Sequence, residues 1–417
     1  MSRRNYLERA IRLVVGRWKG IAILAPVLAA VGMDLALTLP GDATIYHHYA
    51  TQALASPLLH TLPKEYPPIA LVLFLAPMLL PLPYTAAFAV LAALATVVLL
   101  LCSDGLAAFP GWPRRVAIYL FVGAAALLFG RYDIFPALAT FLAVDSARRD
   151  KWGRAWGWTV VGGLLKLFPL ILLPGFLLTE RARTGHWPLR RVVPACMPFA
   201  AVAAFQSALA PGSALSPLLY EARRGFEIES IASDLTLLTD PLHVKWIFSY
   251  GSWEIVGNYH TLISLVVTVA MLAGLIVVWR LTAKGRISVE ASSLAVISVA
   301  ILGDKAFSPQ YMIWLIPLWA YWPLRRGWLT AAALTTLVYP LLFIEAALLG
   351  HGHYPAAAVS VLRNVVLVAA TTRWLQEQVA ARDLIVRHTL CGDPPALKRV
   401  HVSIRSRRYT HETEHVL

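Results

Sequence analysis

The chain contains a recurring series of apolar runs, the longer ones about 16 to 24 residues long, separated by short clusters of arginine, proline and glycine. An α-helix needs about 20 apolar residues to cross the hydrocarbon core of a bilayer. The composition agrees with this pattern, because 58% of the 417 residues are hydrophobic, 14% are charged and the mean hydropathy is +0.63. Soluble proteins rarely have such values. The sequence therefore predicts an integral membrane protein with many transmembrane helices.

The apolar runs also predict where the chain crosses the membrane. Full crossings are expected at residues 21–39, 84–102, 116–130, 132–144, 192–209, 259–281, 289–302, 308–321, 329–349 and 356–370. Prolines interrupt residues 67–82, which predicts a re-entrant or interfacial segment. Lys166 and Pro169 interrupt residues 156–178, which predicts two short helices that meet at the outer face. The predicted fold is all-α: one polytopic bundle of about 12 transmembrane helices with external re-entrant or juxtamembrane helices.

The distribution of basic residues predicts the orientation of this bundle. The chain has 37 Lys and Arg, and most of them fall on one side when 67–82 is not a crossing. Because Lys and Arg accumulate in cytoplasmic loops, both termini of this multi-pass cell-membrane protein are expected in the cytoplasm. The expected organisation is an amphipathic cytoplasmic segment (1–19), a membrane domain (20–375) and a basic cytoplasmic tail (376–417). Nucleic acid is excluded as a partner, because the basic residues flank apolar spans instead of covering a soluble domain.

Two long polar stretches, 40–66 and 211–258, lie on the predicted external face. Asp42 begins the first stretch, whose candidate substrate-binding residues are Tyr46, His47, His48, Glu65 and Tyr66. The candidates in the second stretch are Arg223, Arg224 and Glu227. They belong to the segment RRGFEIE, which is equally consistent with a surface helix held by i,i+4 ion pairs and with a binding role. The outer face carries no DxD-type acidic cluster, so neither a metal nor another cofactor is expected.

Three basic residues remain on the external face, each at the end of an apolar run. They are Arg131 in FGRYDIFPA, Lys166 in LLKLFP and Lys305 in LGDKAFSPQ. Singly, each is equally well explained as a side chain that reaches the membrane surface or pairs with a nearby acid, such as Arg131 with Asp133. Together they favour an anion site, because cations retained outside at helix breaks are expected where a phosphate is held at the level of the lipid headgroups.

These motifs, in this order, resemble the GT-C superfamily of polyprenol-phosphate-sugar-dependent glycosyltransferases, in particular the mannosyltransferases of family 87. The resemblance covers residues 20–375 and rests on four segments. They are GDATIYHHYA, EYPPIALVLFLAP, the run from GRYDIFPALATFLAVD to LLKLFPLILLP, and DKAFSPQYMIWLIPL. It implies a GT-C-like membrane fold and transfer of a hexose, with mannose expected, from a polyprenyl-phosphate donor to a lipid or glycan acceptor outside the cytoplasm.

The resemblance also implies roles for individual residues. Asp42 matches the family's catalytic acidic residue in the first external loop. A carboxylate there can act as the base that takes the proton of the attacking hydroxyl in an inverting transfer. His47 and His48 are alternative bases. The donor phosphate is assigned to Lys305, Arg131 and Lys166, and the turn with Gln310 and Tyr311 is expected to face the lipid carrier. From pattern alone, the favoured role of Asp42 is a cap for the helix that begins at Ala43, and the resemblance reverses this preference.

Two other classes of function remain open from the sequence. A transporter or flippase of a lipid-linked or anionic solute would place charges within its spans, as Asp34 and Arg363 are placed. Transporters also tend to carry internal repeats, and none is evident in this sequence. A membrane protein with a purely structural role is the third possibility.

Overall fold

The computed structural model describes residues 42–55, 63, 65–102, 109–125, 127–209, 216, 219–220, 224–349 and 354–390. The expected N-terminal segment (1–19), the first expected span (21–39) and residues 391–417 lie outside the described residues. The described chain is mostly helical, as the sequence predicts.

Most of the longer helices follow the apolar runs. The α-helices are α2 (Asp42–Ala55), α3 (Ala70–Leu75), α4 (Tyr84–Leu101), α5 (Trp112–Ala124), α6 (Ile134–Arg148), α7 (Trp152–Leu165), α8 (Leu172–Thr184), α9 (Leu189–Leu209), α11 (Ile231–Thr239), α12 (His260–Ala283), α13 (Val289–Gly303), α14 (Met312–Trp319), α15 (Arg326–Leu349) and α16 (Tyr354–Leu390). The 3-10 turns are η1 (Ala76–Leu79), η3 (Phe168–Ile171) and η4 (Pro309–Tyr311). The strands β1 (Phe226–Glu227), β2 (Lys245–Ser249) and β3 (Ser252–Val256) form one antiparallel sheet in the order β1-β3-β2.

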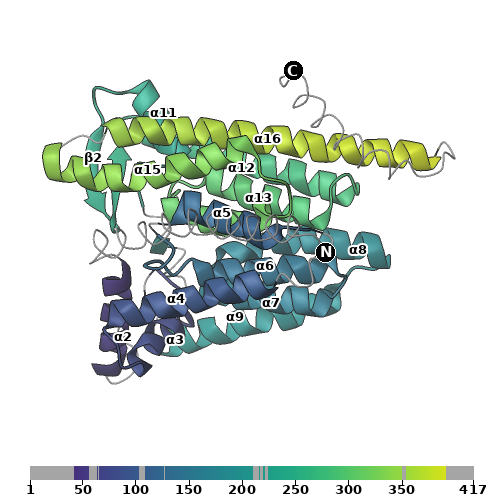
Figure 1. The fold of residues 1–417 in the computed structure, drawn as a ribbon, viewed down its shortest axis with the longest axis horizontal. Coiled ribbons are helices and arrows are strands. Elements are labelled where there is room, and N and C mark those ends of the chain that lie inside the picture. Colours follow the sequence, from purple (N-terminus) through teal and green to yellow (C-terminus); the bar gives the residue numbers. More distant parts are fainter. Residues whose placement is uncertain are drawn as a thin grey trace, which may run out of the picture.

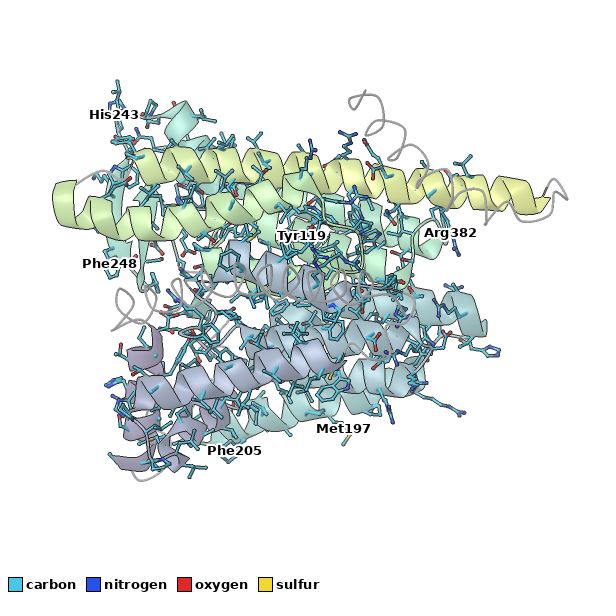
Figure 2. All side chains as sticks on the ribbon, viewed as in Figure 1. Tyr119, Met197, Phe205, His243, Phe248 and Arg382 are labelled. Atoms are coloured by element: carbon cyan, nitrogen blue, oxygen red, sulfur yellow. The ribbon has the colours of Figure 1, made fainter. Side chains whose placement is uncertain are left out.

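Figure 1 shows that the long helices run roughly side by side along the longest axis of the molecule. The small helices α2 and α3 lie at the same end as the sheet and α11, on the left of the view. Helix α8 and the far end of α16 lie at the opposite end. Figure 2 agrees with this division, because His243 and Phe248 lie at the first end and Arg382 at the second. The described parts of the two polar stretches, 40–66 and 211–258, therefore share one end of the helical bundle.

Three helices of the described chain are long and apolar enough to cross a membrane: Tyr84–Leu101, His260–Ala283 and Tyr354–Leu384. They match the expected spans at 84–102, 259–281 and 356–370. Large apolar side chains on the outward faces of α4 and α12 are exposed, among them Leu94, Val97, Leu262, Leu265 and Val269. Exposed apolar surface on this scale marks a contact with lipid or with another protein.

Several of the other expected spans within the described residues form shorter helices. The clearest example is the expected crossing at 308–321, which consists of η4 and the eight-residue helix α14. At 1.5 Å per residue, α14 is about 12 Å long, well short of a hydrocarbon core of about 30 Å. Every residue of α14 is buried, and it packs against α5, α6 and α13. Helix α14 is therefore the centre of the main hydrophobic core, to which it contributes seven apolar side chains besides Pro317.

The predicted break in residues 156–178 is confirmed. Helix α7 ends at Leu165, Lys166 adopts an extended backbone conformation (φ −154°, ψ 136°), and η3 follows with Pro169 in its first turn. Residues 67–82 are also broken, into α3 and η1 with Pro77. The lysine and the prolines end these helices because proline cannot donate the next helical hydrogen bond and lysine is costly in apolar surroundings.

Two features differ from the sequence-based prediction. The expectation of an all-α chain is wrong at residues 226–256, where the three-stranded sheet lies. The surface-helix interpretation of RRGFEIE is also wrong, because Phe226 and Glu227 form strand β1. In addition, α16 runs without a break from Tyr354 to Leu390, across the expected boundary between the membrane domain and the tail.

Candidate functional site

Two polar clusters lie at the end of the molecule that carries α2 and the sheet. We define the Asp42 cluster as Asp42, Tyr46, Tyr66, Arg131, Tyr132, Asp133, Lys166, Tyr311 and Trp314. We define the sheet cluster as Glu65, Tyr220, Arg224, Glu227, Ser249, Ser252, Glu254 and Lys305. Glu65 and Tyr66 are neighbours in the sequence and lie in different clusters, so they join the two.

Asp42 is the first residue of α2, and its carboxylate is held by two side chains. Arg131 Nη1 donates to Asp42 Oδ2. The hydroxyl of Tyr46 lies 3.4 Å from the same oxygen. Tyr46 can reach Asp42 because residues four apart lie on the same face of a helix. The side chains of the ion pair are 16% exposed for Arg131 and 19% for Asp42, so both remain partly accessible to a ligand.

Aromatic side chains fix the position of this ion pair. Tyr46 is fully buried and stacks on Phe74 at a centroid distance of 4.6 Å, with Tyr66 and Tyr132 packed edge-on to it. Burial raises the pKa of Tyr46 and of Tyr66 well above the usual value near 10. Both hydroxyls therefore stay protonated near neutral pH. The Tyr46 hydroxyl can donate to Asp42 while it accepts from the backbone N–H of Tyr132 at 3.3 Å.

A second ion pair lies in the same cluster. Lys166 Nζ donates to Asp133 Oδ1 at 2.9 Å, and Trp314 Nε1 donates to the same oxygen at 2.7 Å. Asp133 is 1% exposed, whereas the Lys166 side chain is 18% exposed. The Lys166 ammonium also lies over aromatic rings, at 4.9 Å from the centroid of Trp314 and 5.1 Å from that of Tyr311. Lys166 takes this position because the helix break lets its extended backbone turn the side chain away from α7.

The turn that carries Gln310 and Tyr311 packs on this second pair. Tyr311 stacks on Trp314 at 3.9 Å, and Phe168 stacks on the other side of the same indole at 3.7 Å. Gln310 Oε1 is buried and has no hydrogen-bond partner among the described residues. The SPQY turn is thus in direct contact with the residues around Lys166.

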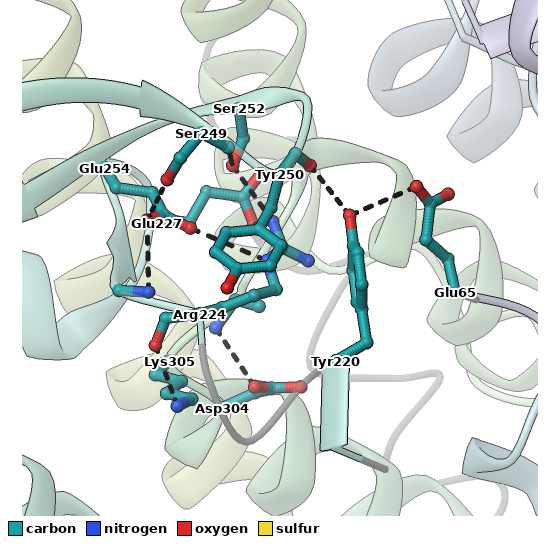
Figure 3. Close-up of polar contacts among 12 residues, drawn as sticks. Glu65, Tyr220, Arg224, Glu227, Ser249, Tyr250, Ser252, Glu254, Asp304 and Lys305 are labelled. Atoms are coloured by element: carbon teal, nitrogen blue, oxygen red, sulfur yellow. Dashed lines mark hydrogen bonds and ion pairs between the residues drawn. The ribbon is translucent and has the colours of Figure 1, made fainter. Parts of the chain in front are cut away.

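The sheet cluster, drawn in Figure 3, holds a second group of charges. Lys305 Nζ donates to the carbonyl oxygen of Arg224 at 2.8 Å, and the N–H of Glu227 donates to the carbonyl oxygen of Lys305 at 2.9 Å. Arg224 also donates to Ser252 Oγ at 3.0 Å and lies 3.7 Å from Glu254 Oε1. The Tyr220 hydroxyl, 3.2 Å from Glu65 Oε1, ties this cluster to Tyr66 and the Asp42 cluster.

A buried polar network connects the sheet region to the candidate span α16. Arg363 is fully buried, donates to the carbonyl oxygen of Glu229 and to Ser360 Oγ, and lies 3.9 Å from the ring centroid of Phe307. Asn364 donates to Asp234 Oδ2 at 2.7 Å. Burial raises the pKa of Glu229 well above its usual range and that of Asp234 to about 7.

The structure brings most of the sequence-predicted residues together, although not all of them. The Asp42 cluster contains Asp42, Tyr46, Tyr66, Arg131, Asp133, Lys166 and Tyr311, and Gln310 lies beside it. The sheet cluster contains Glu65, Arg224, Glu227 and Lys305, so Lys305 is in the other cluster from Arg131 and Lys166. The ion pairs also differ from the alternative expected between Arg131 and Asp133. Arg131 contacts Asp42 instead, and Asp133 contacts Lys166.

The two histidines stand apart from the clusters. His47 and His48 are exposed, and His47 stacks on Tyr84 at 4.4 Å on a different face of α2 from Asp42 and Tyr46. Arg223 lies outside the described residues. Sequence reasoning missed Trp314, although its position three residues after Tyr311 would place both on one helical face. It also missed Tyr220 and Glu254, for which only the aromatic and acidic character of 211–258 gave a signal.

The chemistry available in the Asp42 cluster is acid–base and electrostatic. Two carboxylates can accept protons, two cations can hold an anion, and the cluster offers buried hydroxyls for orientation. The described residues contain no group of three or more His, Cys, Asp or Glu that could hold a metal ion. Searches against protein-family models, curated proteins and solved structures found no match to this chain.

Proposed function

We propose that the chain is a membrane glycosyltransferase that moves a hexose, with mannose expected, from a polyprenyl-phosphate donor to a lipid or glycan acceptor outside the cytoplasm. The observation that carries this proposal is the Asp42–Arg131 ion pair, in which a carboxylate contacts one cation, together with the second cation of the same cluster, Lys166, which pairs with Asp133. The cations suit a phosphate, and the carboxylate suits an attacking hydroxyl. The apolar faces of α4 and α12 suit a membrane setting in which a lipid carrier is available.

Asp42 is the base in the proposed reaction. An acceptor hydroxyl oxygen attacks the anomeric carbon, the bond from that carbon to the phosphate oxygen breaks, and the hydroxyl proton passes to Asp42. Polyprenyl phosphate leaves with the electron pair of the broken bond. Attack from the opposite side inverts the anomeric configuration. Arg131 and Lys166 stabilise the negative charge that develops on the leaving phosphate.

The ion pairs couple donor binding to the release of the base. Arg131 cannot give its strongest hydrogen bonds to Asp42 and to a phosphate with the same N–H groups. A donor phosphate that binds Arg131 therefore competes with Asp42 and leaves its carboxylate available to the acceptor hydroxyl. Tyr46 remains in contact with Asp42 and keeps it in place. Tyr66, Asp133, Gln310 and Tyr311 are the proposed donor contacts around Lys166.

Transfer by the purified protein tests this proposal. With radiolabelled polyprenyl-phosphate hexoses and a membrane acceptor extract, we expect the wild type to move the label to acceptor. Arg131→Gln and Lys166→Gln are expected to raise the donor KM by about 10- to 150-fold, because each loses a charge-assisted hydrogen bond to phosphate worth roughly 1.5 to 3 kcal/mol. Lys305→Gln is expected to have a smaller effect, since the Lys305 amine binds the Arg224 carbonyl.

Lys245→Gln is the matched control for these variants, because Lys245 is an exposed lysine on strand β2 of the same end of the molecule. We expect it to retain the wild-type donor KM. Unchanged donor use in well-folded Arg131→Gln and Lys166→Gln proteins would remove the proposed phosphate site. A wild type that consumes none of the labelled donors would remove the transferase proposal itself.

The proposed topology has about 12 spans, both termini in the cytoplasm and the two clusters outside. It predicts that a cysteine at Leu242, which is 90% exposed near the sheet, reacts with a membrane-impermeant thiol reagent in intact cells. A cysteine at Ala182, exposed in the last turn of α8, should react only after the cells are opened. The native Cys102, Cys196 and Cys391 are first replaced by serine. The reverse labelling pattern would invert the orientation and place both clusters in the cytoplasm.

A transporter or flippase of a lipid-linked or anionic solute is the second candidate. Arg363 favours it, because a buried cation within a candidate span is often part of a solute pathway. The contacts of Arg363 with Glu229, Ser360 and Phe307 favour a structural role instead. The two functions differ in the fate of the donor. A transporter would move intact polyprenyl-phosphate hexose between leaflets, whereas a transferase would separate the hexose from the phosphate.

A further inference from the structure

The turn between β2 and β3 contains an aromatic residue whose backbone conformation is unusual. Tyr250 has φ 51° and Gly251 has φ 75°, so both residues of this two-residue hairpin turn lie in the left-handed region. Asn, Asp and Gly normally occupy the first position, because a larger side chain is disfavoured there. Such a conformation persists only where surrounding contacts determine it, and it is concentrated at functional sites.

Tyr220 supplies those contacts. The rings of Tyr250 and Tyr220 meet edge to face at a centroid distance of 4.9 Å, and the Tyr220 hydroxyl donates to the Tyr250 carbonyl oxygen at 3.1 Å. The guanidinium of Arg224 lies 6.0 Å from the Tyr220 ring centroid. Figure 3 shows the two rings beside the sheet cluster and Glu65. Tyr250 nevertheless remains 40% exposed, so the structure holds its ring firmly and leaves part of it open.

The aromatic pair is adjacent to the proposed catalytic site. The Tyr220 hydroxyl lies 3.2 Å from Glu65 Oε1. The next residue, Tyr66, packs against Tyr46 and has its ring centroid 5.9 Å from the Lys166 ammonium. A ligand that covers the exposed part of Tyr250 would thus extend toward the ion pairs of the Asp42 cluster through Glu65.

We propose that Tyr250 and Tyr220 form a platform for a sugar ring of the acceptor, so that the acceptor is a glycoside and not a bare lipid alcohol. This inference rests on the proposed transferase function. A sugar ring has an apolar C–H face that packs on an aromatic ring and a rim of hydroxyls that require acceptors. The aromatic pair provides a surface for the apolar face, and the neighbouring Glu65 carboxylate provides a hydrogen-bond acceptor for the hydroxyls.

An alternative occupant of this hairpin is the membrane surface itself, because tyrosines are common where membrane proteins meet the headgroup region. Phe248, 62% exposed on strand β2, would serve that purpose as well as Tyr250 does. The two explanations differ in what Tyr250 binds. A membrane anchor needs no affinity for free glycosides, whereas the acceptor platform does.

Binding of soluble glycosides tests the proposal directly. The full-length protein is reconstituted in lipid nanodiscs, because sugar-headed detergents would compete. Saturation-transfer NMR is then recorded with the methyl glycosides of mannose, glucose and galactose. We expect at least one of them to receive saturation at its ring protons. Tyr250→Asn should weaken that binding by about 2- to 10-fold, the loss expected for one aromatic contact. Asparagine suits the left-handed turn, so the hairpin should keep or gain stability.

Phe248→Thr is the matched control, since it removes an exposed aromatic ring from the same hairpin and threonine is favoured in strands. It should leave glycoside binding unchanged. No binding to the wild type, equal binding by Tyr250→Asn, or an equal loss in Phe248→Thr would each overturn the platform. Donor cleavage is measured separately. Glycoside binding without donor cleavage would keep the platform and remove the transferase. Transfer to a glycoside with the same acceptor KM in the wild type and in Tyr250→Asn would keep the transferase and remove the platform.

Discussion

Asp42→Asn is expected to lower the rate of sugar transfer by about 10²- to 10⁴-fold, the usual contribution of a general base. The amide cannot take the proton of the acceptor hydroxyl. Asparagine has nearly the same size and is as good a residue as aspartate at a helix N-terminus, so α2 should remain folded. Donor binding should not weaken, because the uncharged amide competes less than the carboxylate with the donor phosphate for Arg131.

The measurements that check this prediction are turnover, donor KM and the pH dependence of turnover, with the thermal unfolding temperature as the test of folding. The acidic limb of the pH profile reports protonation of the essential base and should be absent in Asp42→Asn. A merely structural role of Asp42 would leave that limb in place. Tyr46→Phe serves as the control, because it removes the hydroxyl at 3.4 Å from Asp42 and keeps the aromatic packing. Because Tyr46 helps to hold Asp42 in place, we expect a smaller loss of turnover than in Asp42→Asn, and the acidic limb should remain.

Near-normal turnover in Asp42→Asn would place the base elsewhere. His47→Gln and His48→Gln would then be tested, although both histidines lie away from the ion pairs. Asp133 is a weaker substitute, since it is 1% exposed and already accepts from Lys166 and Trp314.

Much of the local structure could be predicted from the sequence, because local signals determine it. The long apolar runs of α4, α12 and α16 can be recognised as candidate membrane spans from the sequence alone, by their length and composition. The break at Lys166 could be predicted because a lysine followed by a proline cannot continue an apolar helix. The sheet is not predicted, although KWIFSYGSWEIV holds two aromatic-rich segments around a Tyr-Gly turn, because the turn lacks the Asn or Asp that usually marks a two-residue hairpin.

The ion pairs could not be predicted, because tertiary packing chooses the partners. Arg131 and Asp133 are close in sequence, which favoured a pair between them. In the fold, Arg131 contacts an acid 89 positions away and Asp133 contacts a lysine 33 positions away. The short helix α14 gives a similar case, since its apolar sequence predicts a crossing at 308–321 and does not reveal that every one of its side chains packs inside the protein. Hydropathy measures how apolar a segment is and does not distinguish lipid from protein surroundings.

Arg363→Met is expected to destabilise the protein by about 3 to 5 kcal/mol, the usual cost of removing one partner from a buried charged network. Methionine fills much of the same space and cannot donate a hydrogen bond. The substitution leaves the Glu229 carbonyl without the Arg363 donor, and it removes the positive charge that favours the ionised forms of the nearby Glu229 and Asp234 side chains. The thermal unfolding temperature in detergent is the measurement, with the unfolding free energy where unfolding is reversible.

Arg382→Met is the matched control, because Arg382 lies on the same helix, at the opposite end of the molecule (Figure 2). Its hydrogen bond to the carbonyl of Gly285, 3.3 Å long, is exposed, so its loss should change stability by no more than about 0.5 kcal/mol. The double variant Arg363→Met/Asp234→Asn should recover part of the loss, because it removes a carboxylate that Arg363 neutralises. Equal losses in Arg363→Met and Arg382→Met, or no recovery in the double variant, would show that the buried network does not hold the sheet region to α16.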